Sequence, residues 1–192
     1  MRILFLGPYC REIADFLLTS MDDTVFTEEQ VHPDSAIIKD VDFLISYRYR
    51  YILPGELLKK FTGKAINLHI SFLPWNRGAD PNLWSFLENT PKGVTIHYIN
   101  SGIDTGDIIA QKKLEFNEKD TLRSTYERLS DEVISLFKDV WLDIRNGKVK
   151  HFPQPARGSF HKTADKEKYL YLLSKGWDTP VSDIISKALG KN

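Results

Sequence analysis

Two polar residues, Asn67 and His69, interrupt an apolar stretch near the middle of the chain. Alternate residues of a β-strand face the same side, so we expect these two side chains to point the same way. The glycine-rich turn at 101–107 supplies the nearest acids that can join them, Asp104 and Asp107. An amide, an imidazole and a carboxylate that meet in one place predict an acyl-transfer site.

The chemistry open to such a group is the transfer of a small acyl unit to an amine. The Asn67 amide and a protonated His69 can both donate hydrogen bonds to a carbonyl oxygen that gains charge, and one preorganised donor typically lowers the barrier by about 3–4 kcal/mol. A nearby carboxylate orients the imidazole, raises its pKa and can take a proton from the attacking amine. No serine or cysteine lies beside a base in a recognised nucleophile turn, which favours direct transfer between two bound substrates.

Taken one at a time, these residues also fit structural roles. An asparagine and a histidine at a strand end are often buried residues with satisfied hydrogen bonds, and an aspartate between glycines is often a turn residue. Only the combination of the three residues specifically indicates an acyl-transfer site.

Composition narrows the class of protein. The chain has 192 residues, enough for one domain with a full core, and its apolar and charged fractions of 42% and 27% are those of an ordinary globular protein. Lysine plus arginine equals aspartate plus glutamate, at 26 each, which argues against a nucleic-acid partner. Cys10 is the only cysteine, so we expect no intrachain disulfide and no cysteine-based metal site. We find no signal peptide or membrane span and expect a cytoplasmic protein.

The spacing of apolar residues predicts an α/β fold. Strands are predicted at 3–6, 24–27, 41–46, 65–70, 94–99 and 108–116, with a short one at 158–161. Helices are predicted at 11–19, 55–61, from 80 or 82 to 87, at 120–146 and 166–173, and from 181 onward. A strand, a glycine turn and a helix at the start of the chain indicate a parallel sheet. That turn lacks the dinucleotide-binding fingerprint and gives no support to a nicotinamide enzyme.

The longest predicted helix, 120–146, carries apolar residues at spacings of three and four, and Asp120 is expected to cap it. This stripe is expected to face the core, with a homodimer interface as the alternative. Beyond residue 150 the composition changes, and we interpret 1–150 as the main domain and 151–192 as an appendage packed on it.

The segment 47–53 alternates tyrosine and arginine directly after the strand predicted at 41–46. In open α/β sheets, ligands bind beyond the carboxyl ends of the strands. The segment therefore fits the binding of a planar, anionic ligand, and an exposed edge of surface residues is the alternative.

Four short motifs surround the three candidate residues. They are Asn67-Leu68-His69-Ile70-Ser71-Phe72-Leu73-Pro74, Arg77-Gly78, Gly93-Val94-Thr95-Ile96-His97 and Gly102-Ile103-Asp104-Thr105-Gly106. Together they resemble the folate-dependent formyltransferase family, which has an N-x-H-x-S-x-L-P loop followed by a D-x-G turn. The resemblance covers residues 41–116 well. It implies a Rossmann-like, mostly parallel sheet flanked by helices, and 10-formyltetrahydrofolate as formyl donor without a metal.

The resemblance assigns roles residue by residue. Asn67, His69 and Asp104 take the positions of the family's catalytic residues, which makes 1–150 the catalytic domain. The folate is expected to be held mainly through backbone groups at Arg50, Ile52, Leu53, Leu57, Asn100, Ser101, Gly102 and Ile103. Arg77 and Gly78 are expected to contact the acceptor.

The acceptor expected from the resemblance is an amino-deoxy sugar nucleotide of a surface-polysaccharide pathway. The family also includes enzymes that formylate glycinamide ribonucleotide and methionyl-tRNA. The short C-terminal segment and the net charge of zero weigh against tRNA, and Gly7-Pro8-Tyr9-Cys10 does not match the phosphate loop of the purine enzyme. Another small amine such as glycinamide ribonucleotide, or a non-catalytic folate- or nucleotide-binding module, is the alternative.

Overall fold

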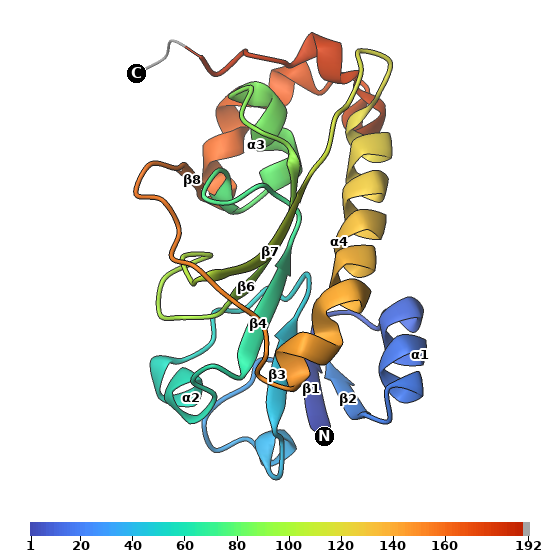
Figure 1. The fold of residues 1–192 in the computed structure, drawn as a ribbon. Helices are drawn as coiled ribbons and strands as arrows, with labels where there is room; N and C mark the ends of the chain where they lie inside the picture. The colour runs from blue at the N-terminus through green and yellow to red at the C-terminus, as the bar shows by residue number, and fades with distance from the viewer. Residues whose placement is uncertain (190–192) are drawn as a thin grey trace.

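A six-stranded sheet forms the centre of the protein (Figure 1). The computed structural model describes residues 1–189. The strands of the sheet are β1 (Arg2–Leu6), β2 (Asp23–Thr27), β3 (Phe43–Ser46), β4 (Ala65–His69), β6 (Gly93–Tyr98) and β7 (Ile108–Lys113). They lie in the order β2-β1-β3-β4-β6-β7; the first four run parallel, and β6 and β7 are each antiparallel to the preceding strand in that order. The prediction of a mostly parallel α/β sheet is confirmed.

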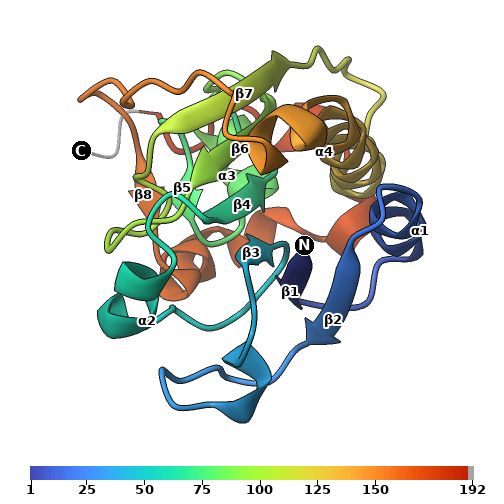
Figure 2. The ribbon, with the colours of Figure 1, turned by 60° about the horizontal axis from the view of Figure 1, so that its bottom comes forward.

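Helices cover both faces of this sheet because its inner strands are apolar on both sides. In β1, Phe5 packs in the core beneath α1 (Arg11–Thr19) and α4 (Leu122–Arg145), whereas Leu4 packs in the core beneath α2 (Gly55–Lys60). The view along the sheet separates the two layers, with α1 and α4 on one side and α2 on the other (Figure 2).

The N-cap of helix α4 lies one residue later than predicted. Thr121 is the N-cap, and its hydroxyl accepts a hydrogen bond from the Ser124 amide at 3.2 Å. Asp120 instead accepts from the Ser124 hydroxyl and pairs with Arg128, so its prediction as the cap is wrong. The apolar stripe faces the core as predicted; its buried residues include Leu129, Val133, Phe137, Trp141 and Ile144.

The C-terminal segment folds back onto α3 (Pro81–Leu87), near the top of Figure 1. Its strand β8 (Phe160–His161) pairs with β5 (Arg77–Gly78), and its buried residues join a core with α3. The helices predicted at 166–173 and from 181 form only 3-10 turns, at Thr163–Leu172, Gly176–Asp178 and Val181–Asp183. Gly176 and Pro180 interrupt the stretch that follows the first of these turns.

The buried carboxylate of Asp22 ties α4 to the start of β2. It accepts a hydrogen bond from the Trp141 indole at 3.0 Å and pairs with Arg145 at 3.2 Å. We expect Asp22→Asn to lower the free energy of unfolding by about 3 kcal/mol, because it leaves a partly buried guanidinium without its counter-charge. Urea unfolding followed by tryptophan fluorescence measures this change.

The matched control for this substitution is Asp23→Asn, at the next position. The Asp23 side chain is 73% exposed and pairs with Arg2 at 3.8 Å, so its loss should change the stability by less than about 1 kcal/mol. Equal effects of the two substitutions would show that the Asp22 contacts do not stabilise the fold.

Candidate active site

The antiparallel pairing of β4 with β6 builds the base of the candidate site. Asn67 and His69 lie two residues apart on β4, and the register places His97 of β6 directly opposite Asn67. Cross-strand partners face the same side of a sheet, so the His97 ring joins the other two side chains. Its Nε2 lies 3.3 Å from Asn67 Nδ2. No role was predicted for His97 from its motif, because only the register of the two strands reveals its position.

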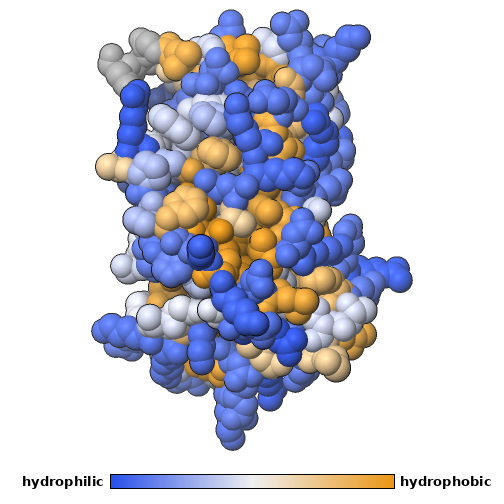
Figure 3. Space-filling view, in the orientation of Figure 1, coloured by the Kyte–Doolittle hydropathy of each residue, from blue (hydrophilic) through white to orange (hydrophobic). Residues whose placement is uncertain are grey.

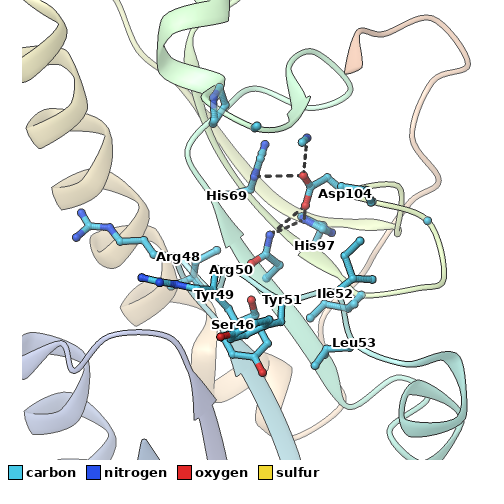
Figure 4. A pocket seen from close by; sticks show the side chains of 18 of the residues that line it. Ser46, Arg48, Tyr49, Arg50, Tyr51, Ile52, Leu53, His69, His97 and Asp104 are labelled. Carbon is cyan, nitrogen blue, oxygen red and sulfur yellow. Dashed lines mark hydrogen bonds and ion pairs between the residues drawn. The ribbon is translucent and has the colours of Figure 1, made fainter. Parts of the chain in front are cut away.

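Asp104 completes the group from the turn after β6. Asn67 Nδ2 donates to Asp104 Oδ1 at 3.2 Å, and His69 Nδ1 lies 3.7 Å from Asp104 Oδ2. The backbone N–H of Gly78 donates to the same Oδ2 at 2.8 Å. Figure 4 shows His69, His97 and Asp104 pointing toward one another. The three residues predicted from sequence therefore do meet in one place, whereas Asp107 pairs with His151.

The turn that carries Asp104 is held in shape by local contacts. Asp104 itself has a left-handed backbone conformation, with φ of 51°. Asn100 Oδ1 accepts hydrogen bonds from the Gly102 amide and the Thr105 hydroxyl. A Cβ atom at Gly106 would lie 1.7 Å from the Tyr98 carbonyl oxygen, so only glycine fits there. The glycines of this turn thus bring the acid back over β4.

A glutamine from the C-terminal segment also holds this turn. Gln154 Nε2 donates to the carbonyl oxygens of Asp104 and Gly106, both at 2.8 Å. Its Oε1 accepts two hydrogen bonds from the Arg77 guanidinium, at 2.7 and 3.0 Å. Gln154 therefore links the Asp104 turn to β5. Nothing in the local sequence marks it, because its partners lie some fifty and more residues away along the chain.

The hydrogen bonds of His69 define which ring nitrogen carries the proton. Its Nε2 lies 3.2 Å from the backbone carbonyl oxygen of Asn76. A carbonyl can only accept, so Nε2 carries the hydrogen and the Nδ1 lone pair of a neutral ring faces Asp104. His69 is thus oriented to take up a proton at Nδ1, next to a carboxylate.

Burial and the neighbouring groups together set the charges of His69 and Asp104. Burial lowers the pKa of His69, and the attraction of Asp104 offsets this only in part. The expectation that Asp104 raises the His69 pKa overall is therefore wrong, and His69 is neutral at neutral pH. Burial alone would raise the pKa of Asp104, but His69, His97 and the Gly78 N–H outweigh it and hold that pKa well below its usual range.

A pocket of about 650 Å³ opens in front of these side chains. One wall carries large apolar residues that are exposed in this structure: Tyr51 at 37%, Ile52 at 71% and Ile103 at 41%. Apolar side chains also gather near the middle of the face in Figure 3. Exposed apolar groups that share one pocket suit a flat organic ring.

Most residues expected to bind folate line this pocket. Those that line it are Arg50, Ile52, Leu53, Asn100, Ser101, Gly102 and Ile103. Leu57 does not, because α2 turns its side chain into the core, where it is fully buried; Leu58 lines the pocket instead. Gly78 lines the opposite side with Phe160–Thr163, whereas Arg77 is held by Gln154 and does not reach it.

The described residues offer no metal site and no membrane helix. Between residues 1 and 189, no three histidine, cysteine, aspartate or glutamate side chains are arranged to hold a metal ion. None of the helices in that part of the chain is long and apolar enough to cross a lipid bilayer.

Known proteins with related sequences include methionyl-tRNA formyltransferases. Methionyl-tRNA formyltransferase of Listeria monocytogenes serotype 4a (strain HCC23) is 33% identical over 136 residues, which are 70% of this chain and 44% of that protein. The chain thus spans about half the length of the curated relatives it matches.

Solved structures with the same fold include sugar formyltransferases. The formyltransferase PseJ from Anoxybacillus kamchatkensis, in complex with UDP-4,6-dideoxy-4-formamido-L-AltNAc and tetrahydrofolate, is 55% identical and has a TM-score of 0.96. The match covers 98% of this chain and 100% of that one. A 4-N formyltransferase from Francisella tularensis is 22% identical, covers 87% of this chain and 78% of that one, and shares the fold with a TM-score of 0.75.

A family model described as formyl transferase matches residues 26–140. The matched region contains Asn67, His69 and Asp104 and the strands β3 to β7. The chain belongs to the formyl transferase family.

Proposed function

We propose that the protein transfers a formyl group from 10-formyltetrahydrofolate to the primary amine of a sugar nucleotide. The observation that carries the proposal is the meeting of Asn67, His69 and Asp104 at one pocket with an apolar wall. The 55% identity to PseJ, solved with tetrahydrofolate and a UDP-linked formamido sugar, supports the donor and the acceptor class. A net charge of zero gives no support to a polyanionic acceptor such as tRNA.

The apolar wall is the part of the pocket that fits the folate. Ile52 and Ile103 come from separate loops and can enclose a flat ring, and backbone groups between 99 and 104 lie beside it. When bound, the folate supplies the formyl group. The protein holds this group against Asn67, His69 and Asp104 and shields it from water.

Hydrogen-bond donors stabilise the charge that forms when the acceptor amine attacks the formyl carbon. A C–N bond forms between the acceptor and the formyl carbon, and the formyl oxygen gains negative charge. As this charge collapses, the bond from the formyl carbon to the folate nitrogen breaks, and the folate nitrogen leaves with the proton that the amine has lost. The Asn67 amide contacts Asp104 and His97 in this structure and can exchange its His97 contact for that oxygen. Asn67 therefore acts as the donor to the oxyanion.

A base must take the proton that the amine loses. Neutral His69 presents the Nδ1 lone pair, and the ionised Asp104 across 3.7 Å stabilises the imidazolium that forms. The Gly78 N–H and the Asn67 amide keep Asp104 in place and charged. The role of Asp104 is thus to orient His69 and to balance its charge.

The first prediction concerns the three proposed catalytic residues. Asn67→Ala, His69→Asn and Asp104→Asn should each lower kcat/KM at least about a hundredfold, because each removes a donor, a base or its counter-charge. The assay follows tetrahydrofolate release with a UDP-linked amino sugar as acceptor, and circular dichroism checks the fold.

Asp107→Asn is the matched control, since Asp107 lies on the same turn but pairs with the exposed His151. It should keep activity within about threefold of the parent protein. Near-normal turnover in two of the three site variants would contradict the proposed roles. A preference for glycinamide ribonucleotide or methionyl-tRNA would contradict the acceptor class.

A second prediction follows from the neutral state of His69. The unfolded chain takes up this proton near the ordinary pKa of about 6.5, and the folded chain only at lower pH. The unfolded state therefore binds more protons below about pH 6.5, and stability must fall as the pH is lowered through that range. The urea midpoint should fall between pH 7.5 and 5.5, and less steeply in His69→Asn. If the urea midpoints of the parent protein and of His69→Asn fall equally with pH, His69 is not held neutral in the folded state.

A third prediction concerns the apolar wall. Ile52→Ser should raise the KM for the folate about tenfold and leave kcat within about twofold, because it removes an apolar contact far from the reacting atoms. Leu18→Ser on α1 is the control, since Leu18 is 73% exposed and lies outside this pocket. Equal KM values for both variants would place the folate elsewhere.

A further inference from the structure

A second cavity of about 240 Å³ adjoins the first. The two cavities share Ile70 and Pro81 in their walls. The second cavity lies between the start of α3, the start of α4 and the C-terminal segment. It is smaller than the roughly 300–1,000 Å³ of common small-molecule sites, so it suits one part of a ligand that continues into the first cavity.

The wall of this second cavity carries two aromatic rings from distant parts of the chain. Trp177, from a 3-10 turn, is 54% exposed, and its ring packs edge-on against Tyr126 of α4 with centroids 5.1 Å apart. An indole exposed in a cavity offers a stacking surface for a flat ring. Apolar side chains line the remainder; they include Ile70, Leu83, Leu122, Leu170 and Leu173.

An ion pair between Asp80 and Lys166 lies on the same wall of the cavity. Lys166 Nζ lies 2.9 Å from Asp80 Oδ2 and 3.1 Å from Oδ1. Asp80 has φ of 53° and precedes α3, yet its side chain makes no capping hydrogen bond. A left-handed backbone in a non-glycine residue is strained, and such strain is often kept at functional sites. The pair offers a hydrogen-bond acceptor beside a donor.

A cation stands near the junction of the two cavities. Arg48 lines the first cavity, and its guanidinium lies 5.0 Å from the centre of the Tyr126 ring, which lines the second. It donates to the Ser130 hydroxyl of α4, and no carboxylate within residues 1–189 pairs with it. In Figure 4 the Arg48 side chain lies at a distance from the group of His69, His97 and Asp104. Its charge is therefore free to bind an anion.

We propose that the second cavity is the nucleobase subsite of the acceptor and takes a pyrimidine. The base stacks on Trp177, its imide N–H donates to Asp80, and Lys166 donates to a ring carbonyl. Arg48 binds the diphosphate, and the sugar passes Ile70 and Pro81 toward His69. The small volume favours a pyrimidine over the larger purine ring. This inference rests on the proposed function, because it divides the same acceptor between two cavities.

Binding of UMP to the full chain tests the stacking surface without any turnover. Calorimetry should show that Trp177→Ala weakens UMP binding about tenfold, as expected for the loss of one base–aromatic stack, whereas Trp177→Phe retains most of the affinity. UMP should also quench tryptophan fluorescence in the parent protein and not in Trp177→Phe. Tyr171→Ala is the control, since Tyr171 is 70% exposed and lies outside the cavity.

Two more variants test the polar contacts. Asp80→Asn keeps a residue that tolerates the left-handed backbone and should reduce the preference for UMP over AMP at least fivefold. Arg48→Met should weaken UDP more than UMP, because it removes the cation assigned to the second phosphate. Equal affinity of the parent protein for AMP and UMP would overturn the pyrimidine assignment. Unchanged UMP binding in Trp177→Ala would overturn the subsite.

These outcomes are separate from failure of the proposed function. If Trp177→Ala binds UMP normally while His69→Asn loses turnover, the proposed formyl transfer is supported and the nucleobase subsite is contradicted. If UMP binding follows the predicted pattern but no UDP-linked amino sugar is formylated, the nucleobase subsite is supported and the proposed reaction is contradicted.

Discussion

The carboxylate of Asp104 is only 13% exposed, and such a group needs close partners to stay ionised. Strand β4 supplies Asn67 and His69, β6 supplies His97, and β5 supplies the Gly78 N–H. The Asp104 turn and three strands thus converge on one buried charge. The site is therefore assembled before any substrate arrives, and binding need not provide the free energy to build it.

The chemistry of the site was largely visible in the sequence. The spacing of Asn67 and His69 fixes their shared face once β4 is recognised, and the turn glycines mark Asp104 as an acid at a sharp return of the chain. His97 belongs to one of the four motifs, but its place in the site was not predicted, because it depends on the register of β4 against β6 and no local pattern encodes a register. Gln154 was missed for the same reason, since its contacts are all long-range.

The elements were predicted well where the pattern is long and periodic and poorly where tertiary contacts decide. Helix α4 and the strands of the sheet were found, but the C-terminal segment forms 3-10 turns, because its conformation follows the surface of α3 and α4. The charge of His69 was also misjudged. Sequence shows that a carboxylate is near, but only the structure shows that burial outweighs it.

The pairing of β5 with β8 brings Phe160–Thr163 of the C-terminal segment into the wall of the pocket. The triad and the residues proposed to hold folate all precede residue 105, whereas Phe160–Thr163 and Trp177 come after α4. The layout therefore separates the residues proposed to handle the one-carbon unit from much of the surface proposed to meet the acceptor. Recombination at the end of α4 would exchange that surface together with Gln154, so a recombinant can keep the geometry of the site only where its new segment also holds the Asp104 turn.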